Sequence, residues 1–162
     1  MRVELTEGLG FSAAHFIIGH KKCEYLHGHN WRVGVTVDGE EDERGLVVDF
    51  LDLKRMMEKI CSVYDHRLLL PSKNPAIKIV SEGKSTRIVV HGREFEFPSS
   101  DVVWIPAVNT TVEEFARVLA DEIVKCLSGR PNVKSIKVFV EESPGQSATE
   151  ERLLGPRPLE VS

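Results

Sequence analysis

The sequence has few cysteines, and their number and spacing argue against a disulfide framework. Only three occur among 162 residues, at Cys23, Cys61 and Cys126. An odd, widely spaced set is typical of a reducing compartment, so we predict a cytoplasmic protein. Cys61 and Cys126 fall among the apolar residues of two expected helices and are predicted to fill the core. Cys23 lies among polar residues and is a candidate for chemistry.

Long apolar runs and an excess of basic residues are also missing. No run of eighteen or more apolar residues occurs, so no membrane-spanning helix is expected. The segment from Met1 to Thr6 alternates like a strand and lacks the pattern of a signal peptide. Lysine and arginine number 21 against 25 acidic residues, a formal net charge of −4. We therefore expect neither a membrane nor a nucleic-acid partner.

The sequence does contain two helical patterns set among strand patterns. Apolar residues recur at helical spacing after Asp49, a suitable N-cap, and again after Thr110, which forms a capping box with Glu113. Alternation over residues 31–38 and 136–142 indicates half-buried strands. We predict one α+β domain over residues 1–162, with a mainly antiparallel sheet and two helices on one face. The proline-rich end, residues 155–162, is expected to be a loosely held tail.

The stretch between the two helical patterns holds further strand patterns. After a polar turn, Leu46 to Asp49 is expected to be extended. Residues 77–80 and 86–90 flank a polar segment and predict a hairpin, and residues 93–97 and 102–105 can extend the sheet. We therefore expect an extra hairpin near residues 77–97.

Three histidines form the most informative pattern. His27 and His29 share the parity of the strand that follows, so both imidazoles project from one face, about 7 Å apart along the strand. Residues 11–16 are expected to form the adjacent antiparallel strand and to direct His15 to the same point. Three neutral histidines with a fourth position open are the ligand set of a catalytic zinc ion. We therefore predict that His15, His27 and His29 bind Zn²⁺.

Cys23 and the pair Asp65-His66 are candidates for proton transfer. Cys23 lies four residues before the His-Gly-His segment, so a short loop can place its thiol close to the predicted metal ion. The thiol can then act as a fourth ligand or as a general base. Asp65 can orient and charge the adjacent imidazole of His66, and such a pair can relay protons to a thiol. His20 and His91 lack such context and are interpreted as surface residues.

Glu142 is a candidate for substrate binding. Its parity places it on the inward face with Val138 and Val140, where a carboxylate must find hydrogen-bond donors. A pterin or purine ring offers an exocyclic amine beside a ring N–H, which a carboxylate can accept with two hydrogen bonds. The alternative for Glu142 is a solvated strand end, which Glu141 alone could equally be.

Together these segments resemble the family of 6-pyruvoyl-tetrahydropterin and 6-carboxy-tetrahydropterin synthases. The resemblance covers residues 11–145 and depends on six motifs in the same order. They are Phe11-Ser12-Ala13-Ala14-His15, Cys23-Glu24-Tyr25-Leu26-His27-Gly28-His29-Asn30, Gly45-Leu46-Val47-Val48-Asp49-Phe50 with Asp52-Leu53-Lys54, Asp65-His66, Asn109-Thr110-Thr111-Val112-Glu113-Glu114, and Val138-Phe139-Val140-Glu141-Glu142-Ser143-Pro144.

The resemblance implies a fold, an assembly and a reaction. The fold is the tunnelling fold, a four-stranded antiparallel sheet with two helices on one side, and subunits join as homo-oligomers, usually hexamers, with active sites between them. The substrate is 7,8-dihydroneopterin triphosphate, from which triphosphate is released. Zinc binds its side-chain hydroxyls and acidifies the adjacent C–H. In the resemblance, Cys23 takes the proton, and Asp65 and His66 adjust the basicity of Cys23. Glu142 binds the pterin ring with help from Thr111.

Other interpretations stay open. The three-residue spacing between Cys23 and His27 is that of the carboxy-pterin enzymes of deazapurine (queuosine-type) biosynthesis, which favours the carboxy product. Glu24 is an alternative base, because relatives that cleave the pterin side chain to 6-hydroxymethyl-dihydropterin in folate synthesis use a glutamate. Two further classes are a zinc-binding module without chemistry and a cupin-like metal oxygenase, and the two helices fit a cupin poorly.

Overall fold

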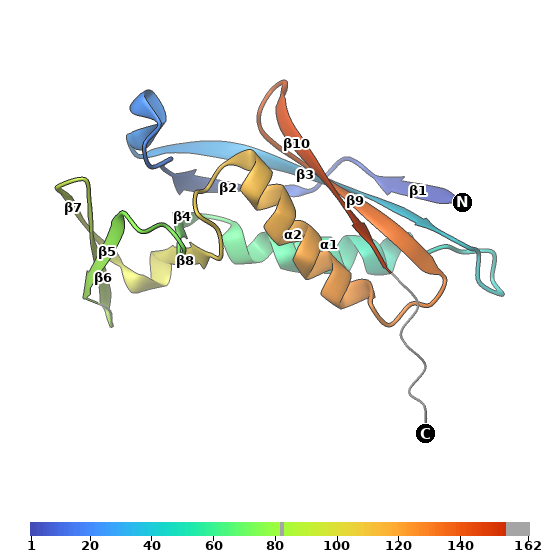
Figure 1. Ribbon diagram of the computed structural model, residues 1–162. Helices are drawn as coiled ribbons and strands as arrows, with labels where there is room; N and C mark the ends of the chain where they lie inside the picture. The colour runs from blue at the N-terminus through green and yellow to red at the C-terminus, as the bar shows by residue number, and fades with distance from the viewer. Residues whose placement is uncertain (82, 155–162) are drawn as a thin grey trace.

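Both helices lie against one face of a large curved sheet, and a small second sheet lies at one end of the molecule (Figure 1). The computed structural model describes residues 1–81 and 83–154; the predicted tail, 155–162, lies outside them. The large sheet contains β1 (Arg2–Leu5), β2 (Gly10–His15), β3 (His27–Gly39), β4 (Arg67–Pro71), β8 (Val102–Ile105), β9 (Val133–Ser143) and β10 (Gln146–Leu153). The helices are α1 (Phe50–Tyr64) and α2 (Val112–Leu127), and the small sheet contains β5 (Ile77–Ser81), β6 (Ser85–Val90) and β7 (Arg93–Pro98).

The predicted α+β class with two helices on one face is confirmed, but the expected four antiparallel strands are too few. In the part of the chain that the structure describes, the large sheet has seven strands in the order β10-β9-β3-β2-β4-β8, with β1 also paired to β3. β4 pairs in parallel with both β2 and β8. Parallel neighbours need a crossover connection. The connection from β2 to β4 contains β3 and α1, and the connection from β4 to β8 contains the small sheet. The additional strands extend the sheet beyond the antiparallel centre that the alternating segments predict.

The two helices begin close to their predicted caps. Asp49 caps α1, and its carboxylate accepts a hydrogen bond from the backbone N–H of Leu51 at 2.8 Å. The cap of α2 is Thr111 and not Thr110: the Thr111 hydroxyl accepts from the backbone N–H of Glu114 at 3.4 Å. The hydroxyl of Thr110 is buried and donates to the carbonyl of Phe16 at 3.1 Å. That tertiary contact removes Thr110 from the capping role.

Of the two cysteines predicted to fill the core, one does so. Cys61 is buried on α1, and burial raises the pKa of its thiol to about 11. Cys126 is exposed near the end of α2, where the neighbouring Leu127 takes the buried position instead. The prediction for Cys126 is therefore wrong by one position in the last helical turn.

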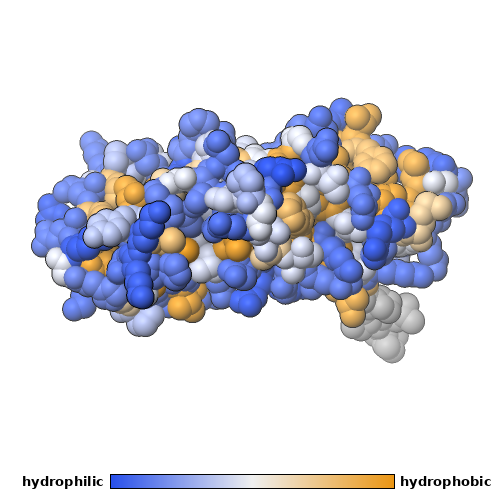
Figure 2. Space-filling model, turned by 90° about the horizontal axis from the view of Figure 1, so that it is seen from above, coloured by the Kyte–Doolittle hydropathy of each residue, from blue (hydrophilic) through white to orange (hydrophobic). Residues whose placement is uncertain are grey.

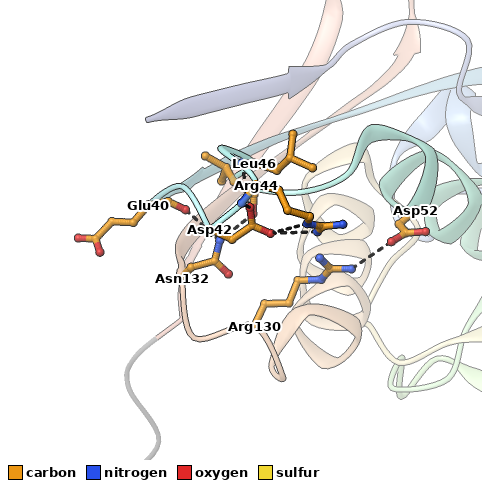
Figure 3. A network of polar contacts seen from close by, with 8 residues as sticks. Glu40, Asp42, Arg44, Leu46, Asp52, Arg130 and Asn132 are labelled. Carbon is orange, nitrogen blue, oxygen red and sulfur yellow. Dashed lines mark hydrogen bonds and ion pairs between the residues drawn. The ribbon is translucent and has the colours of Figure 1, made fainter.

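The segment before α1 is an ordered loop, not the extended strand that was expected for Leu46 to Asp49. The Asp42 carboxylate accepts from the backbone N–H groups of Arg44 and Leu46 at 2.9 and 3.0 Å. Asn132 donates to the carbonyls of Glu40 and Val47, each at 2.9 Å (Figure 3). Side chains thus satisfy the backbone groups that strand pairing would otherwise satisfy.

The extra hairpin near residues 77–97 is a three-stranded antiparallel sheet of order β5-β6-β7. It has a hydrophobic core of its own, in which Phe16 and Ile18 pack with residues of β4 and β6. The segment that follows His15 therefore belongs to the core of the small sheet, while the strand before it belongs to the core under the large sheet. Residues 102–105 extend the large sheet as β8, and residues 93–97 extend the small one as part of β7.

The face of the large sheet opposite the helices is open. Figure 2 views the molecule from that side and shows mainly hydrophilic side chains, with apolar residues gathered toward the half that carries β1. Ion pairs between neighbouring strands occur here, including Arg2 with Asp38 at 2.9 Å and Lys137 with Glu151 at 3.7 Å. In residues 1–81 and 83–154 no helix is both long and apolar enough to cross a membrane.

Candidate active site

The three predicted ligand histidines come together at the end of the β2–β3 pair. His15 lies opposite His27 in the antiparallel register, and Ala13 lies opposite His29. The ring centre of His15 is 4.6 Å from that of His27 and 5.2 Å from that of His29, and the ring centres of His27 and His29 are 5.1 Å apart. One nitrogen from each ring lies within 4.8 Å of the others. Strand parity therefore predicted this cluster correctly.

Hydrogen bonds fix which nitrogen of each ring faces the cluster. Nδ1 of His15 lies 2.9 Å from the carbonyl of Thr110, and Nδ1 of His27 lies 2.7 Å from the carbonyl of Tyr25. A carbonyl only accepts, so each Nδ1 carries the proton and each Nε2 keeps a free lone pair. Nδ1 of His29 lies 3.1 Å from the hydroxyl of Ser143, which can donate or accept, so this contact engages Nδ1 without fixing its proton. These contacts resemble the outer shell that orients metal-ligating histidines.

Burial keeps the His15 ring neutral. Its side chain is fully buried, and burial lowers its pKa to about 4. Burial also lowers the pKa of His29. The Nε2 atom of His15 is buried and has no hydrogen-bond partner among the described residues. An orphaned nitrogen of this kind is costly unless something binds it. A neutral imidazole with a free lone pair beside two others fits a divalent metal ion.

Glu142 lies near His29, close enough for its charge to act on that imidazole. Its carboxylate opposes the lowering of the His29 pKa, as a nearby negative charge does. One carboxylate oxygen, Oε2, is buried without a partner among residues 1–81 and 83–154. Trp31 packs edge-on against His15 and His29, with ring centres 5.2 and 5.8 Å away, and its indole N–H is also buried without a partner. Among the described residues, the site therefore holds an acceptor and a donor without partners next to the three-histidine cluster.

Glu141 is not at a solvated strand end. It is buried on the opposite face of β9, where it pairs with Arg32 of β3 at 2.7 Å. Its other oxygen accepts from the backbone N–H of Gly145 at 3.0 Å. Parity fixes the face on which Glu141 lies but does not show the partner on the neighbouring strand that buries it.

The Asp65-His66 pair forms as predicted, at the end of α1. One Asp65 oxygen accepts from the backbone N–H of Ser12 at 2.8 Å, and the other lies 2.9 Å from Nδ1 of His66. These contacts lower the pKa of Asp65. His66 adopts a left-handed backbone, with φ of 56°, and its side chain is 82% exposed. His66 and His29 both line a cavity of about 470 Å³ whose walls are otherwise mostly small residues of β2 and β3.

Cys23 lies in the single-turn helix η1 (Lys21–Glu24), between β2 and β3. Its backbone closes the loop, with the N–H donating to His20 at 2.9 Å and the carbonyl accepting from Ile17 at 2.7 Å. The thiol is half-buried. Within the described part of one chain, no hydrogen bond joins it to Asp65 or His66, and it is not part of the three-histidine cluster. A single chain thus brings the histidines together but not the thiol and the dyad.

Glu24, the alternative base, is engaged elsewhere. Its carboxylate lies 2.6 Å from Nδ1 of His91, in the turn between β6 and β7. The contact with His91 lowers the pKa of Glu24. His91 was interpreted as a surface residue, and it lies 67 positions after Glu24 in the sequence, so no local pattern indicates the pairing. Thr111, predicted to bind substrate, caps α2 next to the Thr110 carbonyl that holds His15.

Comparison with known proteins gives consistent matches along almost the whole chain. Residues 4–152 match the family model described as 6-pyruvoyl tetrahydropterin synthase. A Methanocaldococcus jannaschii protein, provisionally named 6-carboxy-5,6,7,8-tetrahydropterin synthase, is 34% identical over 147 residues, which are 89% of this chain and 90% of that protein. The 6-carboxy-5,6,7,8-tetrahydropterin synthase of Rickettsia typhi is 30% identical over 142 residues, covering 85% of this chain and 93% of the relative.

The fold matches solved structures of the same kind. Plasmodium vivax 6-pyruvoyltetrahydropterin synthase, in a variant whose catalytic glutamate is replaced by alanine, superposes with a TM-score of 0.87 at 30% identity, covering 94% of this chain and 98% of the other. The unsubstituted Plasmodium vivax enzyme gives a TM-score of 0.86 at 31% identity with the same coverage.

Proposed function

Because the chain belongs to the 6-pyruvoyl tetrahydropterin synthase family, we propose that it is a zinc-dependent lyase that releases triphosphate from 7,8-dihydroneopterin triphosphate. The observation that carries the proposal is the cluster of three histidines whose Nδ1 atoms are all engaged by protein oxygens, which leaves Nε2 of each ring for one metal ion. The short spacing of Cys23 to His27 and the names of the two sequence relatives favour the 6-carboxy product over the 6-pyruvoyl product. We place the enzyme in the cytoplasm.

Each group of residues in the site has a separate task. His15, His27 and His29 would hold the zinc ion, which as a Lewis acid supplies charge stabilisation for the substrate hydroxyls and acidifies the adjacent C–H. Glu142 accepts hydrogen bonds from the exocyclic amine and ring N–H of the pterin, and its buried oxygen without a partner supports this role. Cys23 accepts the proton from the substrate carbon as general base.

The Asp65-His66 dyad serves this base from another subunit. Asp65 is held by the Ser12 N–H and orients the imidazole of His66, which is exposed. In one chain the dyad does not meet the thiol of Cys23, and this supports an assembly with sites between subunits, as expected for the family. We therefore propose a homo-oligomer, with a hexamer as the expected form. The open face and edges of the large sheet are available for such pairing.

A second candidate is cleavage of the pterin side chain to 6-hydroxymethyl-dihydropterin with Glu24 as base. The Plasmodium vivax enzyme has a glutamate as a catalytic residue, and this chain carries a glutamate next to Cys23. The 2.6 Å contact between Glu24 and His91 favours the thiol instead.

Product analysis tests the proposal. The zinc-loaded protein is incubated with 7,8-dihydroneopterin triphosphate, and the pterin product and free triphosphate are measured by chromatography and mass spectrometry. We expect triphosphate, 6-carboxy-tetrahydropterin and a two-carbon C2H4O fragment in equal amounts, because the product keeps only one of the three side-chain carbons. Release of 6-hydroxymethyl-dihydropterin as the main product would assign the second candidate, and no turnover by the zinc-loaded oligomer would reject both.

A further inference from the structure

The small sheet β5–β7 contacts the loop that carries Cys23 through a hydrogen bond, an ion pair and a cation–π contact. His91 holds the Glu24 carboxylate at 2.6 Å, and the Arg93 guanidinium donates to the Glu24 carbonyl at 3.1 Å. The same guanidinium lies over the ring of Tyr25, 5.2 Å from its centre. Figure 1 shows the small sheet and the blue helix η1 at the same end of the molecule. Contacts with the small sheet therefore hold Glu24 and Tyr25, the two residues that follow Cys23, in place.

The geometry of the β6–β7 turn presents His91 to the loop. His91 and Gly92 form a two-residue turn with φ of 48° and 78°, the left-handed pair of a tight hairpin. Histidine, like asparagine and aspartate, is one of the residues other than glycine that adopt a left-handed backbone comparatively often, so it is compatible with this turn. The turn places Nδ1 of His91 2.6 Å from the Glu24 carboxylate.

The small sheet also packs against the residue that follows His15, one of the three clustered histidines. Phe95 of β7 stacks on Phe16, with ring centres 5.5 Å apart and planes at 15°, and Phe16 directly follows His15. The side chain of Asn109 makes two hydrogen bonds with the backbone of Ile18: its amide oxygen accepts from the Ile18 N–H, and its amide nitrogen donates to the Ile18 carbonyl, each at 3.0 Å. The segment from His15 to η1 is thus held from both sides, so the position of the small sheet fixes where the Glu24 carboxylate lies.

We propose that the small sheet determines which reaction the enzyme catalyses. His91 binds the carboxylate of Glu24 and holds it away from the substrate, so that Cys23 alone serves as the base. The inference rests on the proposed function. In the described part of the chain the cluster of possible metal ligands contains no carboxylate, which agrees with a Glu24 that is turned toward His91. His91 is a positioning residue that acts through Glu24 and does not touch the substrate.

The reaction that His91 suppresses has its own atom balance. A carboxylate base takes the proton of the 2′-hydroxyl, a C=O bond forms at C2′, and the C1′–C2′ bond breaks. Its electron pair passes to C1′ and into the conjugated ring, and C1′ then takes a proton. The products are 6-hydroxymethyl-dihydropterin and glycolaldehyde carrying the triphosphate. The thiol-dependent reaction begins instead with a proton on carbon, so the two products report which base acted.

A variant series on a background without the thiol tests the proposal. In Cys23→Ala, we expect little of either product because Glu24 stays on His91. In Cys23→Ala/His91→Ala, the freed carboxylate should raise the yield of 6-hydroxymethyl-dihydropterin at least tenfold over Cys23→Ala. Adding Glu24→Gln should return the yield to that of Cys23→Ala. His91→Gln, whose amide can still donate to Glu24, should keep the product low.

Control variants distinguish the loss of the His91–Glu24 contact from a general disturbance of the small sheet. Arg87→Ala removes the exposed Arg87–Glu96 pair of the same sheet, at 3.2 Å, without touching the loop, and should leave the product low. His91→Phe keeps a ring in the turn but cannot bind Glu24, so it should act like His91→Ala. Equal yields in Cys23→Ala with and without either His91 substitution would overturn the proposal, as would an equal rise in Arg87→Ala. If the parent converts no pterin at all, the proposed function fails instead.

Discussion

Acid should destabilise the metal-free protein through His15. Burial lowers the pKa of this imidazole from its usual 6.5 to about 4, while in the unfolded chain it titrates near 6.5. Below pH 6.5 the unfolded state therefore binds a proton that the folded state does not. Stability that is present above pH 6.5 is lost as the pH falls toward 4. For these pKa values the free energy of unfolding should fall by about 2 kcal/mol between pH 6.5 and pH 4.5 from this group alone.

Urea unfolding of the chelator-treated protein at several pH values measures this loss. The control is His15→Asn, whose amide can donate to the Thr110 carbonyl as Nδ1 does but does not titrate. Carboxylates contribute equally to both proteins, so the difference between the two curves isolates His15. In thermal melts the same loss corresponds to roughly 4–8 °C for a chain of this size. Parallel pH dependence of the parent and His15→Asn would refute the claim that His15 is buried as a neutral imidazole.

Three further predictions concern the substrate, the base and the assembly. Glu142→Gln should weaken binding of a pterin ligand about tenfold to a hundredfold, because a charged hydrogen-bond acceptor is lost. The exposed Glu151→Gln should bind it like the parent in the same fluorescence titration, and equal affinity of all three proteins would reject the anchor. Cys23→Ala should abolish triphosphate release while metal analysis still finds zinc; full activity would exclude the thiol as base. Light scattering should give a mass above that of a monomer, and an active monomer would contradict a site shared between subunits.

Much of the fold and the three-histidine cluster can be predicted from local sequence patterns. The period of two from His27 through Trp31 set the face of β3, and the short chain between His15 and His27 left antiparallel pairing as the simplest arrangement. The start of α1 at Asp49 followed in the same way, because an N-cap acts through backbone groups two residues away. Such features depend on residues close in sequence, and local patterns predict them well.

Features that depend on distant residues could not be predicted. Thr110 and Thr111 each precede a glutamate by three residues, and only the contact of Thr110 with Phe16, 94 residues away, decides that Thr111 is the cap. Glu141 is buried because Arg32 lies beside it on another strand. The parallel pairing of β4 with β2 depends on the path of α1 across the sheet. No pattern within one segment contains this information.

Metal-dependent turnover tests the central claim most directly. The protein is stripped with a chelator, Zn²⁺ is added back in steps, and bound zinc and triphosphate release from 7,8-dihydroneopterin triphosphate are measured on the same samples. If His15, His27 and His29 form one catalytic zinc site, activity rises in proportion to bound metal and reaches its plateau at one zinc per chain, and His27→Ala and His29→Ala each lose both tight binding and activity. Full turnover by the stripped protein, or full zinc occupancy in both single variants, would contradict it.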